Sequence, residues 1–210
     1  MSTNGNKFLG GVDFDDKLVE YFLNKFCEKN KFQQEEIKKD KKAIRRLKIA
    51  CEKLKRDLSF NQRATLSIYS FYDNIDILET ISRFEFNDMC QDLINKLEKP
   101  LKRALKDAKI KNEDITQIIL VGGSTKLPMV KSFLKNFFIN SKINDTINPD
   151  EAVAYGATLM AAKILLNPDN ILSDFNLLDI TPLSLGIEVK NKSKDKEIQK
   201  EGGRMSIIIN

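Results

Sequence analysis

Apolar residues in the first sixty positions recur at the spacing of amphipathic helices. Leu18, Phe22 and Phe26 repeat every four residues, which predicts a helix with one buried face, and Asp13 is suited to capping its start. A second helix is predicted from about Lys41 to Leu58, because its apolar positions also share one face. Those positions are Ile44, Leu47, Cys51, Leu54 and Leu58.

The pattern then changes to the period of a β-strand. Residues 64–71 alternate apolar and polar positions, residues 72–74 (Tyr-Asp-Asn) have turn chemistry, and residues 75–81 return as the partner of a hairpin. Residues 84–108 are predicted to be helical, with a break or kink at Pro100.

Residues 118–128 read Ile-Ile-Leu-Val-Gly-Gly-Ser-Thr-Lys-Leu-Pro and combine three local signals. The apolar run 118–121 predicts a strand buried on both faces, Gly122 and Gly123 permit a sharp turn, and Pro128 suits the first turn of a helix. Ser124 is a helix-capping residue type. A strand, a glycine turn and a helix start favour an electron-rich ligand, although an ordinary strand-to-helix turn fits the pattern equally. The run lacks the Gly-Lys-Ser/Thr ending of a Walker loop and the three spaced glycines of a dinucleotide fingerprint.

A polar stripe accompanies the apolar face of the second helix. Its members are Glu52, Lys55, Arg56 and Ser59, spaced at i, i+3, i+4 and i+7. At 100° per residue they occupy a stripe roughly 100° wide, about a right angle from the apolar face. The stripe is either a binding surface or a solvated salt-bridge face, because Glu52 and Arg56 form an ordinary i,i+4 pair.

Composition and charge narrow the function classes. The chain has 210 residues, 41% hydrophobic content and a net charge of +5, with no polybasic block typical of nucleic-acid or membrane binding. Histidine is absent, which excludes Ser-His-Asp, Cys-His and histidine-metal chemistry. Three cysteines without framework spacing, and an N-terminus without an apolar core, favour a reducing, cytoplasmic location. We therefore expect neither nucleic acid nor a membrane as a partner.

Several segments together resemble the heat-shock protein 70 (DnaK-type) chaperone family. Val-Gly-Gly-Ser-Thr-Lys-Leu-Pro at 121–128 resembles its adenosine motif, and Ile-Asn-Pro-Asp-Glu-Ala-Val-Ala-Tyr-Gly-Ala at 147–157 resembles its next segment. Leu-Leu-Asp-Ile-Thr-Pro-Leu-Ser-Leu-Gly-Ile-Glu at 177–188 is similar to its interdomain linker and first substrate-domain strand. The resemblance extends from about residue 7 to the C-terminus.

The resemblance implies an α/β fold, namely an actin-like ATPase (ribonuclease H-like) lobe with an added helical and hairpin subdomain. Residues 7–168 would form the second lobe of the nucleotide-binding domain, with the helical and hairpin subdomain at about 12–111 and a sheet-helix part at about 112–168. Residues 169–182 would be the interdomain linker. Residues 183–210 would be an incomplete start of the β substrate-binding domain, with strands at 183–189 and 205–209.

The resemblance also implies a site for ATP or ADP. In the family, residues matching Glu52, Lys55, Arg56 and Ser59 border the adenine and ribose. The residues matching Gly122, Gly123 and Ser124 lie across from them. Lys126 stands where the family usually has arginine, which replaces a planar stacking group with a point charge. Asp150 either contributes through water or simply caps the following helix.

We expect this chain to supply only the adenosine side of the site. The family's phosphate-binding loops and first lobe are absent from it, so we assign no catalytic residue, expect no hydrolysis from this chain alone, and expect Mg²⁺ only with the missing lobe. The predicted function is adenine-nucleotide binding within an ATP-dependent folding chaperone. Nucleotide exchange factors and J-domain co-chaperones are the implied partners, and unfolded polypeptide would require a full substrate domain. The alternatives are a truncated, non-catalytic module that binds those factors, and a fragment without an independent role.

Overall fold

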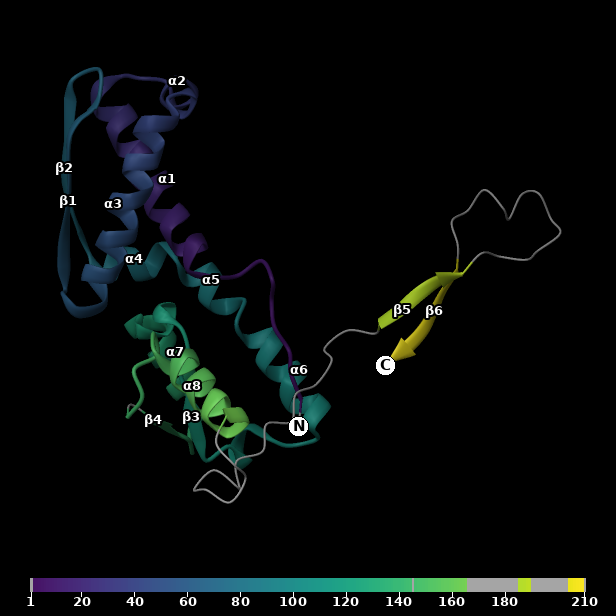
Figure 1. The fold of residues 1–210 in the computed structure, drawn as a ribbon. Coiled ribbons are helices and arrows are strands. Elements are labelled where there is room, and N and C mark those ends of the chain that lie inside the picture. The colour runs from purple at the N-terminus through teal and green to yellow at the C-terminus, as the bar shows by residue number, and fades with distance from the viewer. Residues whose placement is uncertain (1, 145, 166–184, 190–203, 210) are drawn as a thin grey trace. The chain divides into compact units, whose positions relative to one another are not determined.

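The computed structural model describes residues 2–144, 146–165, 185–189 and 204–209. Residues 4–162 belong to one compact unit, and the C-terminal residues from 163 onward belong to another. The first unit begins with α1 (Gly11–Asn30), α2 (Gln34–Lys39), α3 (Lys41–Phe60), β1 (Arg63–Tyr72) and β2 (Ile75–Ser82) (Figure 1). It continues with α4 (Arg83–Met89), α5 (Gln91–Asn95), α6 (Glu98–Ala108), β3 (Gln117–Ile119), α7 (Pro128–Phe137), β4 (Lys142–Asn144) and α8 (Ala152–Leu165).

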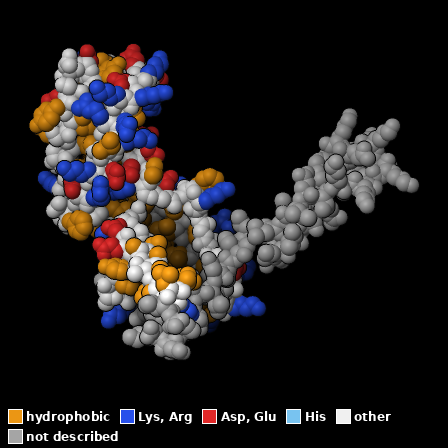
Figure 2. All heavy atoms as spheres, viewed as in Figure 1, with side chains coloured by type: hydrophobic (Ala, Val, Ile, Leu, Met, Phe, Trp, Pro, Cys, Tyr) orange, Lys and Arg blue, Asp and Glu red, His pale blue; other side chains and the backbone are white. Residues whose placement is uncertain are grey.

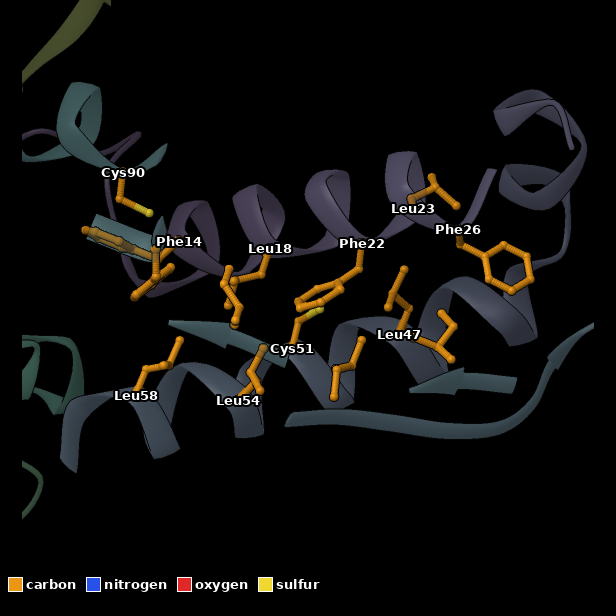
Figure 3. Close-up of a cluster of buried hydrophobic side chains, with 14 of the residues drawn as sticks. Phe14, Leu18, Phe22, Leu23, Phe26, Leu47, Cys51, Leu54, Leu58 and Cys90 are labelled. Atoms are coloured by element: carbon orange, nitrogen blue, oxygen red, sulfur yellow. The ribbon is translucent and has the colours of Figure 1, made fainter. Parts of the chain in front are cut away.

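The main core lies between α1 and α3, whose apolar faces point toward one another (Figure 3). Leu18 and Phe22 from α1 are at most 1% exposed, and Leu47 and Cys51 from α3 are fully buried. Burying a large apolar side chain of this kind stabilises the fold by about 1.5–3 kcal/mol relative to exposure. Burial also raises the pKa of the Cys51 thiol to about 12, so this cysteine acts as a small apolar core residue.

The two long helices begin with different caps. Asp40 precedes α3, and its carboxylate accepts the backbone N–H groups of Lys42 at 2.9 Å and Ala43 at 3.0 Å. Asp13 lies inside the first turn of α1, where its carboxylate accepts the Gly10 N–H at 2.7 Å. Asp13 therefore caps the predicted helix from its third position instead of preceding it.

The predicted hairpin is confirmed, with one departure from strict alternation. β1 and β2 pair antiparallel through a turn in which Asp73 and Asn74 have positive φ angles of 50° and 57°. The pairing shifts between Ile68 and Tyr72, where Ser70 has a φ of 43°. This bulge turns Phe71 inward to 3% exposure, although simple alternation would place it on the opposite face from Ile68.

The helical stretch after the hairpin is divided differently from the prediction. It forms three helices, with interruptions at Cys90 and at Lys96–Leu97. Pro100 lies in the first turn of α6, where its missing N–H removes no intrahelical hydrogen bond. The break therefore precedes the proline.

The glycine turn follows a parallel strand pair. β3 pairs with β4 from Gln117 opposite Lys142 to Ile119 opposite Asn144. The prediction of a strand buried on both faces is wrong for the described residues, because Ile119 is 58% and Val121 48% exposed. The described part of this sheet contains two strands, which cannot cover both faces. Pro128 occupies the first turn of α7, as predicted.

The C-terminal strands form a separate antiparallel hairpin. β5 (Leu185–Val189) pairs with β6 (Arg204–Ile209), which agrees with the two strands expected from the sequence. The predicted linker at 169–182 and the residues 190–203 between the two strands lie outside the described residues. Within the described part of the chain, every helix is too short or too polar to span a lipid bilayer.

Candidate functional site

The polar stripe of α3 and the glycine turn meet at one cavity of about 370 Å³. Its lining residues are Glu52, Lys55, Arg56, Ser59, Phe60, Gly123, Ser124, Lys126, Leu127 and Asp150. Eight of the nine residues predicted for the site are among them, and Gly122 is the exception. A cavity of this size is within the range of small-molecule sites.

On the α3 side, the exposed polar groups of the cavity are already arranged by local contacts. Arg56 Nη2 lies 3.3 Å from Glu52 Oε1, in the i,i+4 pair expected from the sequence, with the arginine side chain 70% exposed. The Ser59 hydroxyl donates to the Lys55 carbonyl at 3.3 Å. The Glu52 carboxylate, the guanidinium and the hydroxyl oxygen retain hydrogen-bonding capacity toward a ligand.

Lys55 differs from its neighbours because its ammonium group is held by α1. Lys55 Nζ donates to the Gly11 carbonyl at 2.9 Å and lies 2.9 and 3.0 Å from the two Asp15 carboxylate oxygens. Burial raises the pKa of Asp15, and the hydrogen bond and charge of Lys55 act in the opposite direction. The Lys55 ammonium group is therefore occupied by these contacts with α1, and the aliphatic stem is the part of the side chain that can contact a ligand in the cavity.

The opposite wall depends on two glycines for different reasons. Gly122 has a φ of 89° and donates its N–H to the Pro149 carbonyl at 2.8 Å, which closes the turn. Gly123 has no side chain to separate it from Asp150, and a Cβ there would lie 2.7 Å from Asp150 Oδ1. Gly122 therefore allows the backbone turn and lies outside the cavity lining. Gly123 lies within the lining, where the absence of a Cβ lets Asp150 approach the backbone closely.

Asp150 lines the cavity beside Lys126. The Lys126 ammonium and the Asp150 carboxylate form an ion pair across the two segments. At the start of α8, Asn148 accepts instead: its carbonyl receives the N–H groups of Glu151 and Ala152, each at 3.0 Å. Within the described residues, the contact made by the Asp150 carboxylate is with Lys126 and not with a backbone N–H of α8, which differs from the capping alternative.

Sequence reasoning missed three residues of this region. Phe60 lines the cavity while remaining 76% exposed, and Leu127 lines it while 2% exposed. Asp15 lies behind the cavity and holds Lys55. Phe60 follows Ser59 at the end of the polar stripe, and Leu127 follows Lys126, so adjacency to predicted residues was the available signal. Nothing in the local sequence connects Asp15 to Lys55.

The site thus joins the helical and hairpin part to a glycine turn around one small cavity. The chain is a member of the Hsp70 family: the family model described as Hsp70 protein matches residues 1–203. Membership implies an actin-like ATPase fold, and the described residues are a mixture of helix and strand.

Individual relatives agree with this assignment. The chain is 43% identical over 188 residues to heat shock cognate 70 kDa protein 3 of Dictyostelium discoideum, which covers 90% of this chain and 29% of the relative. It is 43% identical over 190 residues to heat shock 70 kDa protein 2 of Paracoccidioides lutzii, covering 89% of this chain and 28% of the relative. It is 39% identical over 188 residues to heat shock 70 kDa protein BIP3 of rice (Oryza sativa subsp. japonica), covering 90% and 28%. The chain thus spans less than a third of the length of these relatives.

Proposed function

We propose that this chain supplies the adenosine-binding wall of an Hsp70-type nucleotide site within an ATP-dependent folding chaperone. The observation that carries the proposal is the convergence of eight predicted residues on one cavity from three segments of the chain, namely α3, the glycine turn and the loop before α8. A solvated salt-bridge face on α3 would not need the glycine turn to lie opposite it. Hydrolysis and Mg²⁺ binding are expected only together with the family's first lobe.

Each residue has a role that its contacts permit. The Arg56 guanidinium is exposed and oriented by Glu52, so it can lie against the face of a purine. Glu52 can accept hydrogen bonds from ribose hydroxyls, and Ser59 can bond a ring nitrogen. The Lys55 stem and the exposed Phe60 ring add apolar surface beside the base.

The charges around the cavity favour a nucleoside over free phosphate. Each cation in the lining has an acidic partner: Lys55 pairs with Asp15, Arg56 with Glu52 and Lys126 with Asp150. An anionic phosphate would have to compete with these carboxylates, whereas a neutral base and sugar would not. We therefore expect adenosine to bind about as tightly as ADP, with a dissociation constant on the order of 0.1–1 mM because only one wall is present.

Calorimetry with adenosine, ADP and guanosine tests the proposal. Arg56→Ala should weaken adenosine binding several-fold, on the order of the 1 kcal/mol expected for a partly desolvated cation–π contact. Arg45→Ala is the matched control, because Arg45 is an exposed residue of the same helix outside the cavity lining. Equal effects of the two substitutions, or guanosine binding as tightly as adenosine, would contradict an adenine site.

A second candidate function is a non-catalytic module that binds exchange factors or co-chaperones. The outer face of the β1–β2 hairpin favours it, because Tyr69 is 76% and Leu78 67% exposed there, and Leu78 pairs with Ser67. J-domain co-chaperones are further proposed partners, and binding of unfolded polypeptide is proposed only together with a full substrate-binding domain. Pull-down of an exchange factor with and without ATP separates the two candidate functions. Binding of the exchange factor by a chain that has no affinity for nucleotide would favour the interaction module. Loss of that binding in the double variant Tyr69→Ser and Leu78→Ser would place the docking surface on the hairpin.

A further inference from the structure

Helix α6 lies in a segment with a marked excess of basic residues. Residues 95–111 contain seven lysines and arginines and two acidic residues. The segment therefore has a net charge of +5, and residues 38–56, which include most of α3, form a second basic segment with ten basic and two acidic residues. Over the part that contains α1, α3 and the hairpin, both basic and acidic side chains are visible on the surface (Figure 2).

Helix α6 displays this charge on one exposed face. Lys99, Lys102, Arg103 and Lys106 are all exposed and recur at helical spacing. Together with Asn95 and Glu98 they line a groove of about 350 Å³. Lys102 pairs with Glu98 at 2.5 Å, whereas the side chains of Lys99, Arg103 and Lys106 make no hydrogen bond or ion pair within the described residues. Three cationic groups are therefore available to a partner.

The other side of α6 is turned into the protein. Leu97, Pro100 and Leu101 line a separate apolar cavity with α7 residues, and the Ser2 hydroxyl donates to the Ala104 carbonyl at 2.6 Å. The basic face is thus held outward by packing of the apolar face. Because those leucines are engaged internally, the helix cannot insert them into a lipid surface while it keeps this packing.

We propose that the basic face of α6, defined by Lys99, Lys102, Arg103 and Lys106, docks an acidic segment of another protein. From Lys99 to Lys106 the helix rises about 10 Å, which matches three or four residues of an extended peptide. Carboxylates spaced along such a segment would meet the three available cations, and Arg103 can bind one carboxylate with two parallel hydrogen bonds. The groove lining contains no aromatic side chain, so it lacks the stacking surface typical of single-stranded nucleic-acid sites.

Fluorescence anisotropy with a labelled twelve-residue peptide tests this docking surface. The peptide carries six glutamates interleaved with glycine and alanine, and a second peptide carries glutamine at the same six positions. The glutamate peptide should bind at low salt and weaken steeply as salt is added, whereas the glutamine peptide should not bind. Equal binding of the two peptides, or none at millimolar glutamate peptide, would overturn the proposal.

Matched variants locate the surface. Lys99→Gln, Arg103→Gln and Lys106→Gln combined should weaken binding on the order of tenfold. The control combines Lys42→Gln, Arg45→Gln and Lys53→Gln, which removes the same charge from exposed positions of α3 and should change affinity by less than about twofold. Equal losses would mean that net charge alone attracts the peptide, and would overturn the assignment to α6.

Two further probes distinguish the class of partner. Phosphatidylserine vesicles and a twenty-base-pair DNA duplex are measured under the same conditions. Tighter binding of either probe than of the peptide, lost in the α6 variant, would overturn the acidic-protein assignment in favour of that class. Backbone NMR shifts induced by the peptide in the unsubstituted protein should centre on α6, which keeps the test decisive if the triple variant unfolds.

Discussion

The ammonium group of Lys55 and the carboxylate of Asp15 form an ion pair between α3 and α1, with Nζ 2.9 Å from Oδ1, directly behind the cavity. Their side chains are 11% and 14% exposed, so little solvent compensates either charge. The pair therefore joins the main helical core to the candidate site. It also determines which part of Lys55 faces the cavity, because the charged end of the side chain is held by Asp15.

Removing the Lys55 ammonium group should destabilise the folded state, because the buried Asp15 carboxylate would lose its cationic partner. We expect Lys55→Met to lower the free energy of unfolding by about 2–3 kcal/mol at neutral pH, because Asp15 would keep its charge without a partner. Lys48→Met is the control, since Lys48 pairs with Asp16 at 3.2 Å while both side chains are more than half exposed. That substitution should cost less than about 0.5 kcal/mol in urea denaturation.

The pH dependence of this variant follows from the raised pKa of Asp15. Loss of Lys55 removes the two influences that lower this pKa, so the folded carboxyl should hold its proton to still higher pH. The folded state then binds more protons than the unfolded state, and its stability rises as pH falls. The defect in Lys55→Met should therefore shrink in mildly acidic buffer. A defect that grows on acidification would contradict this account of the pair.

The two glycines of the turn should respond differently to alanine. At Gly122 the φ of 89° makes alanine costly, so Gly122→Ala should lower stability by about 1–2 kcal/mol. Nothing lies within 4 Å of a Cβ there, so adenosine affinity should be nearly unchanged in the folded fraction. Thermal unfolding and calorimetry on the same samples measure both effects.

Gly123→Ala should have a small effect on stability and a larger effect on adenosine binding. Its Cβ would lie 2.7 Å from Asp150 Oδ1, and Asp150 is a half-exposed side chain that can move away at small cost. We expect stability to fall by less than about 1 kcal/mol, while displacement of Asp150 and Lys126 weakens adenosine binding. If Gly123→Ala binds adenosine normally, the close approach at this wall has no role in the site.

Replacing Lys126 with arginine should strengthen adenine binding. A guanidinium can keep the pair with Asp150 and also lie flat against a purine, which an ammonium group cannot do. A several-fold gain in affinity, on the order of 1 kcal/mol, is expected by calorimetry. Equal or weaker binding by Lys126→Arg would favour the interaction-module function over nucleotide binding.

Glu79 gives a pH test of the helical and hairpin part. It pairs with Lys25 at 2.9 Å and Lys29 at 3.1 Å, and the hydrogen bond from Lys25 is the main cause of its lowered pKa. A lowered carboxyl pKa contributes stability above the unfolded value of 4.5, and that contribution is lost as pH falls through the folded pKa. Glu79→Gln should therefore cost about 0.5–1 kcal/mol at neutral pH and almost nothing in strong acid. A cost independent of pH would show that packing, and not charge, explains Glu79.

The elements with the strongest periodicity were the ones that sequence predicted well. The apolar faces of α1 and α3 repeat over several turns, and burial of Leu18, Leu47 and Cys51 followed directly from that repeat. The bulge at Ser70 was not predictable, because a non-glycine residue at a positive φ leaves no mark on the apolar pattern. The break before α6 was not predicted at its true place, because a proline marks the interior of a helix as broken but is tolerated in the first turn, where Pro100 lies.

The candidate site also has a part that the sequence predicted and a part that it did not. Spacing on α3 placed Glu52, Arg56 and Ser59 on one face, and family resemblance placed the glycine turn opposite them. The pair between Lys55 and Asp15 depends on how two helices pack, so local sequence could not predict it. The same holds for the ion pair of Lys126 with Asp150, which joins residues from two separate segments.

A backbone NMR titration of the intact chain with adenosine tests the central claim most directly. The predicted result is that signals of Ser59 on α3 and Gly123 in the turn shift together and give the same dissociation constant, because both belong to the lining of one cavity. Signals from the exposed residues Lys38 and Lys39 of α2, outside that lining, should stay unchanged. No shifts at millimolar adenosine, or shifts at one wall without the other, would contradict an adenosine site formed by these two segments.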